Sequence, residues 1–185
     1  MQNNRPFSIT TKIGDHGTTR ALSGETLSKA HPRIVACGMV DELVSALGMA
    51  RATANNCPLG HALLDIQKTL FRLATEISAG PHYVKQQAKL DVMAVHNLEL
   101  QRRKLEKTLR PVRTFIVPGE TILGAHLDLA RTLTRRCECA VVSLTEHGEL
   151  HNPQALIWLN RLSDLLWLMA RQAEVHSRPL DKTRA

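Results

Sequence analysis

The sequence predicts an all-α protein, a bundle of five amphipathic helices preceded by an irregular N-terminal arm. Three observations support this fold class. Apolar residues make up 43% of the 185-residue chain, yet it has only two Trp, one Tyr and three Phe, a composition that favours packed helices over a β-sandwich or barrel. Apolar positions recur at helical spacing in five segments. No segment alternates convincingly as a strand does, and the length suits one domain with its own core.

Residues 1–31 lack helical periodicity and form the predicted arm. The stretch from Thr10 to Arg20 reads T-T-K-I-G-D-H-G-T-T-R, with glycines that allow tight turns close to a ligand. Threonine hydroxyls, exposed backbone N–H groups, Lys12 and Lys29 have the chemistry to surround phosphate oxygens. The stretch matches neither a Walker A loop nor a dinucleotide-binding fingerprint. An ordinary polar arm is the alternative interpretation.

The first helix is expected from Pro32 to about residue 53, because proline suits an early helical position and the apolar residues that follow have helical spacing. Asp41 and Glu42 interrupt the helix midway. Asp41 either needs a cationic partner or is a solvated acid.

Four further helices complete the predicted bundle. Turn residues separate them, namely Asn55–Pro58, Ser78–Pro81, Arg110–Pro111 with Pro118–Gly119, and Gly148 with Asn152–Pro153. The helices are expected at about residues 59–77, 89–109, 120–146 and 153–176. Short connections predict an up-and-down arrangement of the ferritin-like kind. The helical part then covers residues 32–177, and residues 178–185 form a short disordered tail.

The helix at 120–146 carries the densest polar chemistry. Arg131, Arg135 and Glu138 share one face, because residues three, four and seven apart line up on a helix. Asp128 extends this face by one turn, and Arg136 lies beside it. Two guanidiniums next to a carboxylate suit a polyphosphate with its divalent cation. A solvated face with an internal ion pair is the alternative.

Two further segments contain candidate functional residues. The segment F-I-V beginning at Phe115 is apolar in a chain with few aromatics, and Phe115 is either core filler or functional. In the last helix, Asn160 lies on the same side as Asp164, and Arg161 is expected to form an i,i+3 ion pair with Asp164.

The net charge of +7 predicts an anionic partner. The basic residues are scattered with little aromatic interleaving, so nucleic acid is not expected. No apolar run reaches the length of a membrane span, and the N-terminus lacks the apolar core of a signal peptide. Four cysteines do not form a disulfide framework. These features predict a cytoplasmic protein with no membrane partner.

The sequence argues against several kinds of chemistry. No Glu is followed by His three residues later, as a ferritin-like di-metal site requires, and zinc spacings are missing. No nucleophile motif is present either. The residues suit holding a nucleoside triphosphate, while the attacking group would come from a second substrate.

Five blocks together carry a family resemblance. They are T-K-I-G-D-H-G-T-T, G-M-V-D-E-L, F-I-V-P-G, A-R-T-L-T-R-R-C-E and L-N-R-L-S-D-L-L, in order across about residues 10–173. Together they resemble the PduO-type ATP:cob(I)alamin adenosyltransferases. The resemblance implies a homotrimer with active sites between subunits, the substrates ATP and reduced cobalamin, and Mg²⁺. It also suggests a reductase or an acceptor cobalamin-dependent enzyme as partner, and leaves association with a bacterial microcompartment open.

The resemblance also implies residue roles. The ATP loop would comprise Thr11, Lys12, Gly14, Asp15, Gly17, Thr18 and Thr19, with Lys29 as a further phosphate contact. Arg131 and Arg135 would hold the polyphosphate with Arg136 close by, Glu138 would lie near Mg²⁺, and Asn160 would contact the nucleotide. Asp41 would pair with Arg131 across the subunit boundary. Phe115 would crowd the lower face of the corrinoid, which disfavours the axial ligand and eases reduction to Co(I).

The chain also departs from the family pattern. Glu120 replaces the usual second glycine, Val44 an Asn, Cys37 a Tyr and Cys139 an Arg, and the C-terminal extension is nearly absent. Most of these departures concern the corrinoid side. They motivate an alternative function, an ATP-binding sensor or regulatory trimer that has lost transfer activity.

Overall fold

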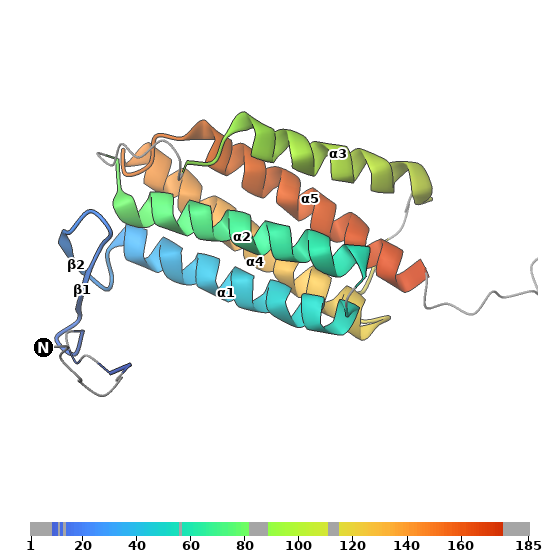
Figure 1. Ribbon diagram of the computed structural model, residues 1–185, viewed down its shortest axis with the longest axis horizontal. Helices are drawn as coiled ribbons and strands as arrows, with labels where there is room; N and C mark the ends of the chain where they lie inside the picture. Colours follow the sequence, from blue (N-terminus) through green and yellow to red (C-terminus); the bar gives the residue numbers. More distant parts are fainter. Residues whose placement is uncertain are drawn as a thin grey trace, which may run out of the picture.

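The structure is a computed structural model that describes residues 9–10, 12, 14–55, 57–81, 89–110 and 115–175. The described residues contain the five predicted helices and confirm the all-α bundle (Figure 1). The helices are α1 (Pro32–Ala54), α2 (Pro58–Ala79), α3 (Val92–Thr108), α4 (Ile122–Glu146) and α5 (Pro153–Val175). The boundaries of the expected tail at residues 178–185 lie outside the described residues.

The arm is more regular than predicted. It contains a β-hairpin, in which β1 (Thr18–Arg20) pairs with β2 (Thr26–Ser28) in antiparallel register. The expectation of no strand was therefore wrong. Strands of three residues are too short for an alternating pattern to be visible, and the turn between them depends on Gly24, whose φ of 90° favours glycine.

Side-chain caps explain where two helices begin. Asp91 accepts a 2.8 Å hydrogen bond from the backbone N–H of Ala94 at the start of α3. Thr121 accepts one of 2.9 Å from Gly124 N–H at the start of α4. Such caps satisfy N–H groups that have no partner within the helix. Both helices therefore begin two or three residues later than the apolar spacing alone predicted.

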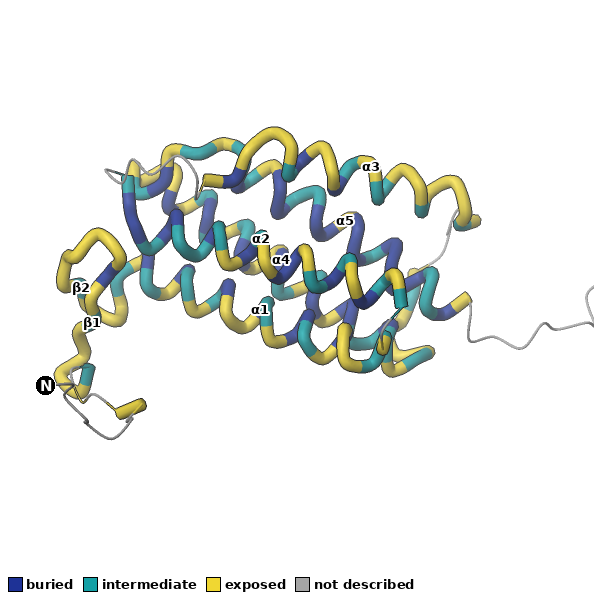
Figure 2. Tube along the Cα trace, in the orientation of Figure 1, coloured by how far each residue is buried: buried dark blue, intermediate teal, exposed yellow. Residues whose placement is uncertain are grey.

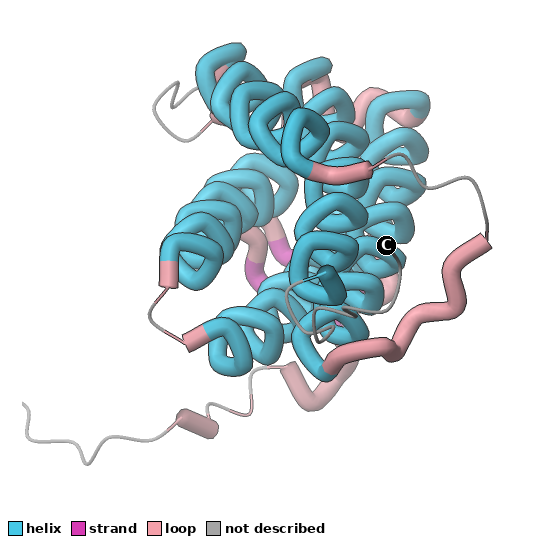
Figure 3. Tube along the Cα trace, turned by 90° about the vertical axis from the view of Figure 1, so that its right-hand side faces the viewer, coloured by secondary structure: helices cyan, strands magenta, loops and turns pink. Residues whose placement is uncertain are grey.

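The helices pack in a fixed order around one core. α4 packs against both α1 and α5, α2 lies on α1, and α3 lies on α5 (Figures 1 and 3). The buried positions face inward along every helix, whereas α3 is exposed along much of its length (Figure 2). The largest fully buried side chains are Trp158, Leu43, Leu47, Leu63, Leu70, Leu73, Ile77, Leu127, Leu144, Leu159, Leu162 and Leu165. In the described ranges no helix is apolar over a length that would cross a bilayer.

The antiparallel packing of α1 and α4 sets the two ends of the molecule. Thr53 Oγ1, at the end of α1, lies 3.1 Å from His126 Nδ1, near the start of α4. The hairpin precedes the start of α1 and the segment 115–121 precedes the start of α4. These two segments therefore lie at opposite ends of the bundle (Figures 1 and 3). The 23 residues of α1 separate them by about 35 Å.

Candidate functional site

The predicted ATP loop turns back on itself. The backbone N–H of Asp15 donates to Lys12 O at 3.3 Å, and that of Gly17 donates to Gly14 O at 3.2 Å. Lys12 and Gly17 both adopt positive φ, 59° and 77°. The side chains of Lys12, Asp15 and Thr18 are exposed. The loop thus presents hydroxyl and ammonium donors to solvent, and Thr11 lies outside the described residues.

Lys29 joins this loop through the hairpin. The pairing of Thr18 with Ser28 brings the next residue back to the loop, where Lys29 N–H donates to Gly17 O at 2.8 Å. A Cβ atom at Gly14 would lie 2.9 Å from Lys29 Nζ. Glycine at position 14 therefore makes room for the ammonium. The structure brings together Lys29 and the loop that the sequence singled out.

The three arginines of α4 have different surroundings. Arg131 is half-buried, and its Nε donates to Asp128 Oδ1 at 3.3 Å. Arg136 forms an ion pair with Glu42 of α1. Arg135 is exposed and has no hydrogen-bonding or ionic partner in the described part of the chain. Its guanidinium is therefore available to an external anion.

Glu138 belongs to a chain of polar contacts that crosses three helices. Asn160 of α5 donates to Glu138 Oε1 at 2.8 Å, and Arg161 Nη1 donates to Asn160 Oδ1 at 2.8 Å. Arg161 Nε then lies 3.3 Å from Glu99 Oε1 of α3. The expected ion pair between Arg161 and Asp164 was therefore wrong. The partner comes from a helix that sequence spacing cannot bring near.

A buried ionic cluster lies beneath the arginine face. Asp128, Arg171 and Glu174 are only 4%, 5% and 6% exposed. Arg171 Nη2 donates to Asp128 Oδ2 and, at 2.9 Å, to Glu174 Oε1. The guanidinium also lies 5.7 Å from the centroid of the Trp167 ring, a favourable cation–π distance. Asp128 is thus shared by Arg171 and Arg131.

Sequence reasoning placed Asp128 on the outer polar face and missed Arg171. The sequence contained one indication that Arg171 is buried, since it follows the apolar run L-L-W-L-M-A of the last helix. A charge in such surroundings has to be paired when it is buried. Spacing along one helix could not identify the partner on another helix.

Phe115 is fully exposed, with a relative accessibility of 106%. Val117 and Ile122 in the same region are 83% and 71% exposed. The interpretation of Phe115 as core filler was therefore wrong. Clustered exposed apolar side chains are typical of a surface that binds a ligand or another chain.

Asp41 lies exposed on α1, and its carboxylate has no ionic partner in the part of the chain that the structure describes. Arg131, its expected partner across a subunit boundary, contacts Asp128 within the same chain. The Asp41 carboxylate is therefore open to a second chain.

One chain does not gather all predicted residues into a single cavity. No hydrogen bond or ion pair between described residues joins the Gly14–Thr19 loop to α4, and the segment that precedes α4 lies at the opposite end of the bundle from that loop (Figure 1). The described residues also contain no cluster of three His, Cys, Asp or Glu side chains able to hold a metal ion alone. The polar arm and the apolar segment therefore lie at separate places on one chain.

Two of the departures from the family pattern lie between α1 and α2. Cys37 is half-buried, its Sγ donates to Ala74 O at 3.6 Å, and burial raises the pKa of its thiol to about 11. The carbonyl of Val44 accepts a 2.8 Å hydrogen bond from Gln67 Nε2. Both residues thus contact α2.

Comparison with known proteins gives a consistent result. Residues 9–173 match the family model described as cobalamin adenosyltransferase. The chain is 36% identical over 172 residues to a corrinoid adenosyltransferase of Citrobacter freundii, covering 91% of this chain and 96% of that one. It is 39% identical over 175 residues to a cobalamin adenosyltransferase of Cupriavidus metallidurans, covering 91% and 89%. It spans 50% of the length of a second Citrobacter freundii relative, the corrinoid adenosyltransferase PduO.

Solved structures agree with the sequence comparison. A variant of the PduO-type ATP:corrinoid adenosyltransferase from Lactobacillus reuteri, complexed with cobalamin and ATP, superposes with a TM-score of 0.84 at 34% identity, over 91% of each chain. A second variant of that protein, complexed with ATP, gives 0.81 at 35% identity, over 90% of this chain and 94% of the other.

Proposed function

Because the chain belongs to the cobalamin adenosyltransferase family, we propose that it transfers the 5′-deoxyadenosyl group of ATP to cob(I)alamin and releases triphosphate. The Co(I) of the substrate attacks C5′ of ATP and forms the Co–C bond. The C5′–O bond breaks, and its electron pair leaves with the triphosphate. The protein supplies no nucleophile, and its part is to orient C5′ and stabilise the departing charge.

The observation that carries the ATP half of this proposal is the contact between Lys29 and the glycine loop. The ammonium of Lys29 lies against Gly14, in a loop whose Lys12 and Thr18 side chains are exposed. Lysine ammoniums and backbone N–H groups in tight turns are typical phosphate ligands. The residues that then bind ATP are Thr11, Lys12, Gly14, Asp15, Gly17, Thr18, Thr19 and Lys29.

The arginines of α4 supply the remaining positive charge. Arg131 and Arg135 hold the polyphosphate, Arg136 lies close by, and Asn160 contacts the nucleotide. The exposed guanidinium of Arg135 and the fixed one of Arg131 support these roles. Arginine forks match phosphate oxygens in pairs.

Mg²⁺ fits the same arrangement. An ion that arrives with phosphate oxygens uses only one or two protein carboxylates and keeps several waters. Glu138 meets that need, since Asn160 orients its carboxylate through a single hydrogen bond to Oε1. The ion would neutralise phosphate charge, and Glu138 would hold it near the arginines.

Phe115 is the residue that we assign to the corrinoid in the proposed function. Its complete exposure supports contact with the lower face of the corrinoid rather than with the protein core. Crowding there disfavours the axial ligand and leaves cobalt four-coordinate, which eases reduction of Co(II) to Co(I).

The complete site is assembled from two chains of a homotrimer. Three features support this arrangement: the arm and Phe115 lie about 35 Å apart in one chain, Asp41 is open to a second chain, and apolar Met49 of α1 and Leu129 of α4 are each 44% exposed. Asp41 of one chain then pairs with Arg131 of its neighbour.

The proposal includes a cytoplasmic location, with microcompartment association open. It is supported by the cysteines, since all four are free, including the exposed Cys139, and free thiols suit a reducing compartment. A reductase that supplies electrons to Co(II) and an enzyme that accepts the product are the expected partners.

An anaerobic spectral assay tests the function. Reduced cobalamin, ATP and Mg²⁺ are mixed with the protein, and the Co(I) absorbance is expected to fall as a light-sensitive Co–C product appears. ATP binding with no loss of Co(I) would contradict transfer and favour the sensor alternative. The relatives described above are all named as adenosyltransferases, so they give that alternative no support.

A further inference from the structure

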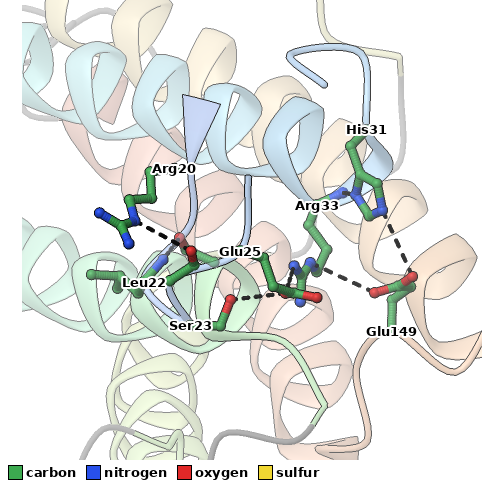
Figure 4. Close-up of polar contacts among 9 residues, drawn as sticks. Arg20, Leu22, Ser23, Glu25, His31, Arg33 and Glu149 are labelled. Carbon is green, nitrogen blue, oxygen red and sulfur yellow. Dashed lines mark hydrogen bonds and ion pairs between the residues drawn. The ribbon is translucent and has the colours of Figure 1, made fainter. Parts of the chain in front are cut away.

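Arg33 occupies an unusual position for a cation. It is the second residue of α1 (Figure 4). Only 3% of it is exposed. The N-terminus of a helix carries a partial positive charge, so a buried guanidinium there is unfavourable unless carboxylates surround it. The burial of Arg33 therefore has to be explained by the carboxylates that it contacts.

Two carboxylates from distant parts of the chain meet Arg33. Glu25, which immediately precedes β2, accepts a hydrogen bond from Arg33 Nη2 at 2.5 Å. Glu149, in the connection between α4 and α5, places Oε2 3.6 Å from Arg33 Nε. Its other oxygen lies 3.9 Å from His31 Nε2 (Figure 4). Arg33 therefore links the hairpin to the bundle.

The end of α2 is shaped to admit this link. Gly80 has a φ of 74°, and a Cβ atom there would lie 1.6 Å from Arg33 Nη1. Ser78 Oγ accepts a 3.2 Å hydrogen bond from the backbone N–H of Leu22 in the hairpin. Ala21 in the same turn is buried. The hairpin is thus seated against the bundle by one ion pair, one hydrogen bond and a buried methyl group.

The seated hairpin is continuous with the phosphate-binding residues. β1 begins directly after the Gly14–Gly17 loop, and β2 ends directly before Lys29. A displacement of the hairpin would therefore move both the loop and Lys29.

We propose that Arg33 is a positioning residue that, through Glu25, holds the hairpin on the bundle and so sets the place of the glycine loop and Lys29 for ATP. Neither Arg33 nor Glu25 needs to touch the nucleotide. The identity of the ligand rests on the proposed function, whereas the seating of the arm does not.

Glu25→Gln is the decisive variant. The Glu25 side chain is 56% exposed, so the substitution removes its charge without opening the core. Asp65→Asn is the matched control, because it removes an exposed carboxylate that pairs with Lys68 at 3.5 Å. Asp65 lies 13 residues before Ser78 on α2, about 20 Å along the helix axis from the hairpin.

Two measurements follow the seating of the arm. Trypsin cleavage after Lys12, Arg20 or Lys29, all exposed, is expected to quicken about three- to fivefold in Glu25→Gln, because cleavage follows the population of the released arm. The KM for ATP is expected to rise by a similar factor, with kcat at saturating ATP and the KM for cobalamin unchanged. Asp65→Asn should match the wild type in both, and the melting temperature of Glu25→Gln should fall by no more than about 3 °C.

Arg33→Lys provides an independent variant, because it keeps the charge but loses the fork that reaches both carboxylates. It should reproduce the faster cleavage, and adding Glu25→Gln to it should have little further effect. Unchanged cleavage in Glu25→Gln would overturn the proposal even if KM moved. If the wild-type protein transfers no adenosyl group, the proposed function fails, while the cleavage experiment still tests the seating.

Discussion

The position of Arg131 is fixed by a buried group of charged side chains that includes Asp128. Asp128 uses one carboxylate oxygen for Arg131 and the other for buried Arg171, which also holds Glu174. Breaking such a buried group leaves an unpaired charge, which costs several kcal/mol. The half-buried Arg131 is thus oriented by residues that are almost completely buried.

Arg131→Ala is expected to lower kcat by at least about a hundredfold, since in the proposed site it removes a donor to the departing triphosphate. The oligomeric state should stay the same, as measured by size-exclusion chromatography. Arg103→Ala is the control, because Arg103 forms an exposed ion pair with Glu99 on α3 and should keep full activity. Near-normal transfer by Arg131→Ala would refute the role of this residue.

Phe115→Ala tests the corrinoid contact. In the proposed site, removing the aromatic ring would allow the axial ligand to approach the lower face, so the reaction that starts from Co(II) cobalamin with a reductant should slow. The reaction that starts from pre-formed Co(I) should slow much less, since reduction has already occurred. Parallel rate measurements from both substrates give this ratio, and equal losses would contradict the role of Phe115.

At the scale of one element, the hairpin joins the Gly14–Gly17 loop to Lys29, and Glu25 connects it to Arg33 of α1. The hydrogen bond from Arg33 holds the pKa of the Glu25 carboxyl below its ordinary value of 4.5, with smaller contributions from Ser23 and His31. Glu149 faces Arg33 from the opposite side. Because the folded pKa of Glu25 is lowered, its ionised form stabilises the seated hairpin.

The sign of the pH effect follows from that shift. The stabilisation is fully present above the ordinary pKa of 4.5 and is lost as the pH falls through the lowered pKa. Protection of the Ala21 and Gly24 amides from hydrogen exchange, corrected for intrinsic rates, should fall in that acidic range. In Glu25→Gln the protection should be low throughout and should not change there. The same acid-dependent step in Glu25→Gln would assign it to another group.

At the scale of the whole molecule, the two segments to which we assign the substrates lie at opposite ends of the bundle (Figure 1). The arm lies at the end where α1 begins, and the exposed apolar segment with Phe115 lies at the end where α4 begins (Figure 1). These ends are about the length of α1 apart, so in the proposed function a single chain would not bring both to the same pair of substrates. The proposed trimer resolves this by placing the arm of one chain beside Phe115 of its neighbour.

Mixed trimers test this arrangement. Chains with Lys12→Ala and Lys29→Ala are unfolded and refolded together with an equal amount of Phe115→Ala chains. About a quarter of the sites should then combine an intact arm with an intact Phe115, because each site draws on two neighbouring chains. The rate from Co(II) cobalamin should exceed that of either parent by about a quarter of the wild-type rate. A mixture no faster than the average of its parents would place both ends in one chain's site.

Several features followed from the sequence alone. Apolar spacing predicted five helices within three residues of their observed ends, because burial of one helix face imposes a local period. The glycine loop was found because tight turns need glycine at particular places. Lys29 was grouped with that loop because its ammonium suits phosphate oxygens, and the structure places the two in contact.

The tertiary structure alone decided the pairings of charge. Glu25, Arg33 and Glu149 come from three separate segments, and Asp128 meets Arg171 across two helices. The physical reason is that a helical period specifies which residues point inward, but an ion pair between elements depends on how those elements pack. The burial of Arg33 and Arg171, and the exposure of Phe115, therefore became visible only in the folded chain.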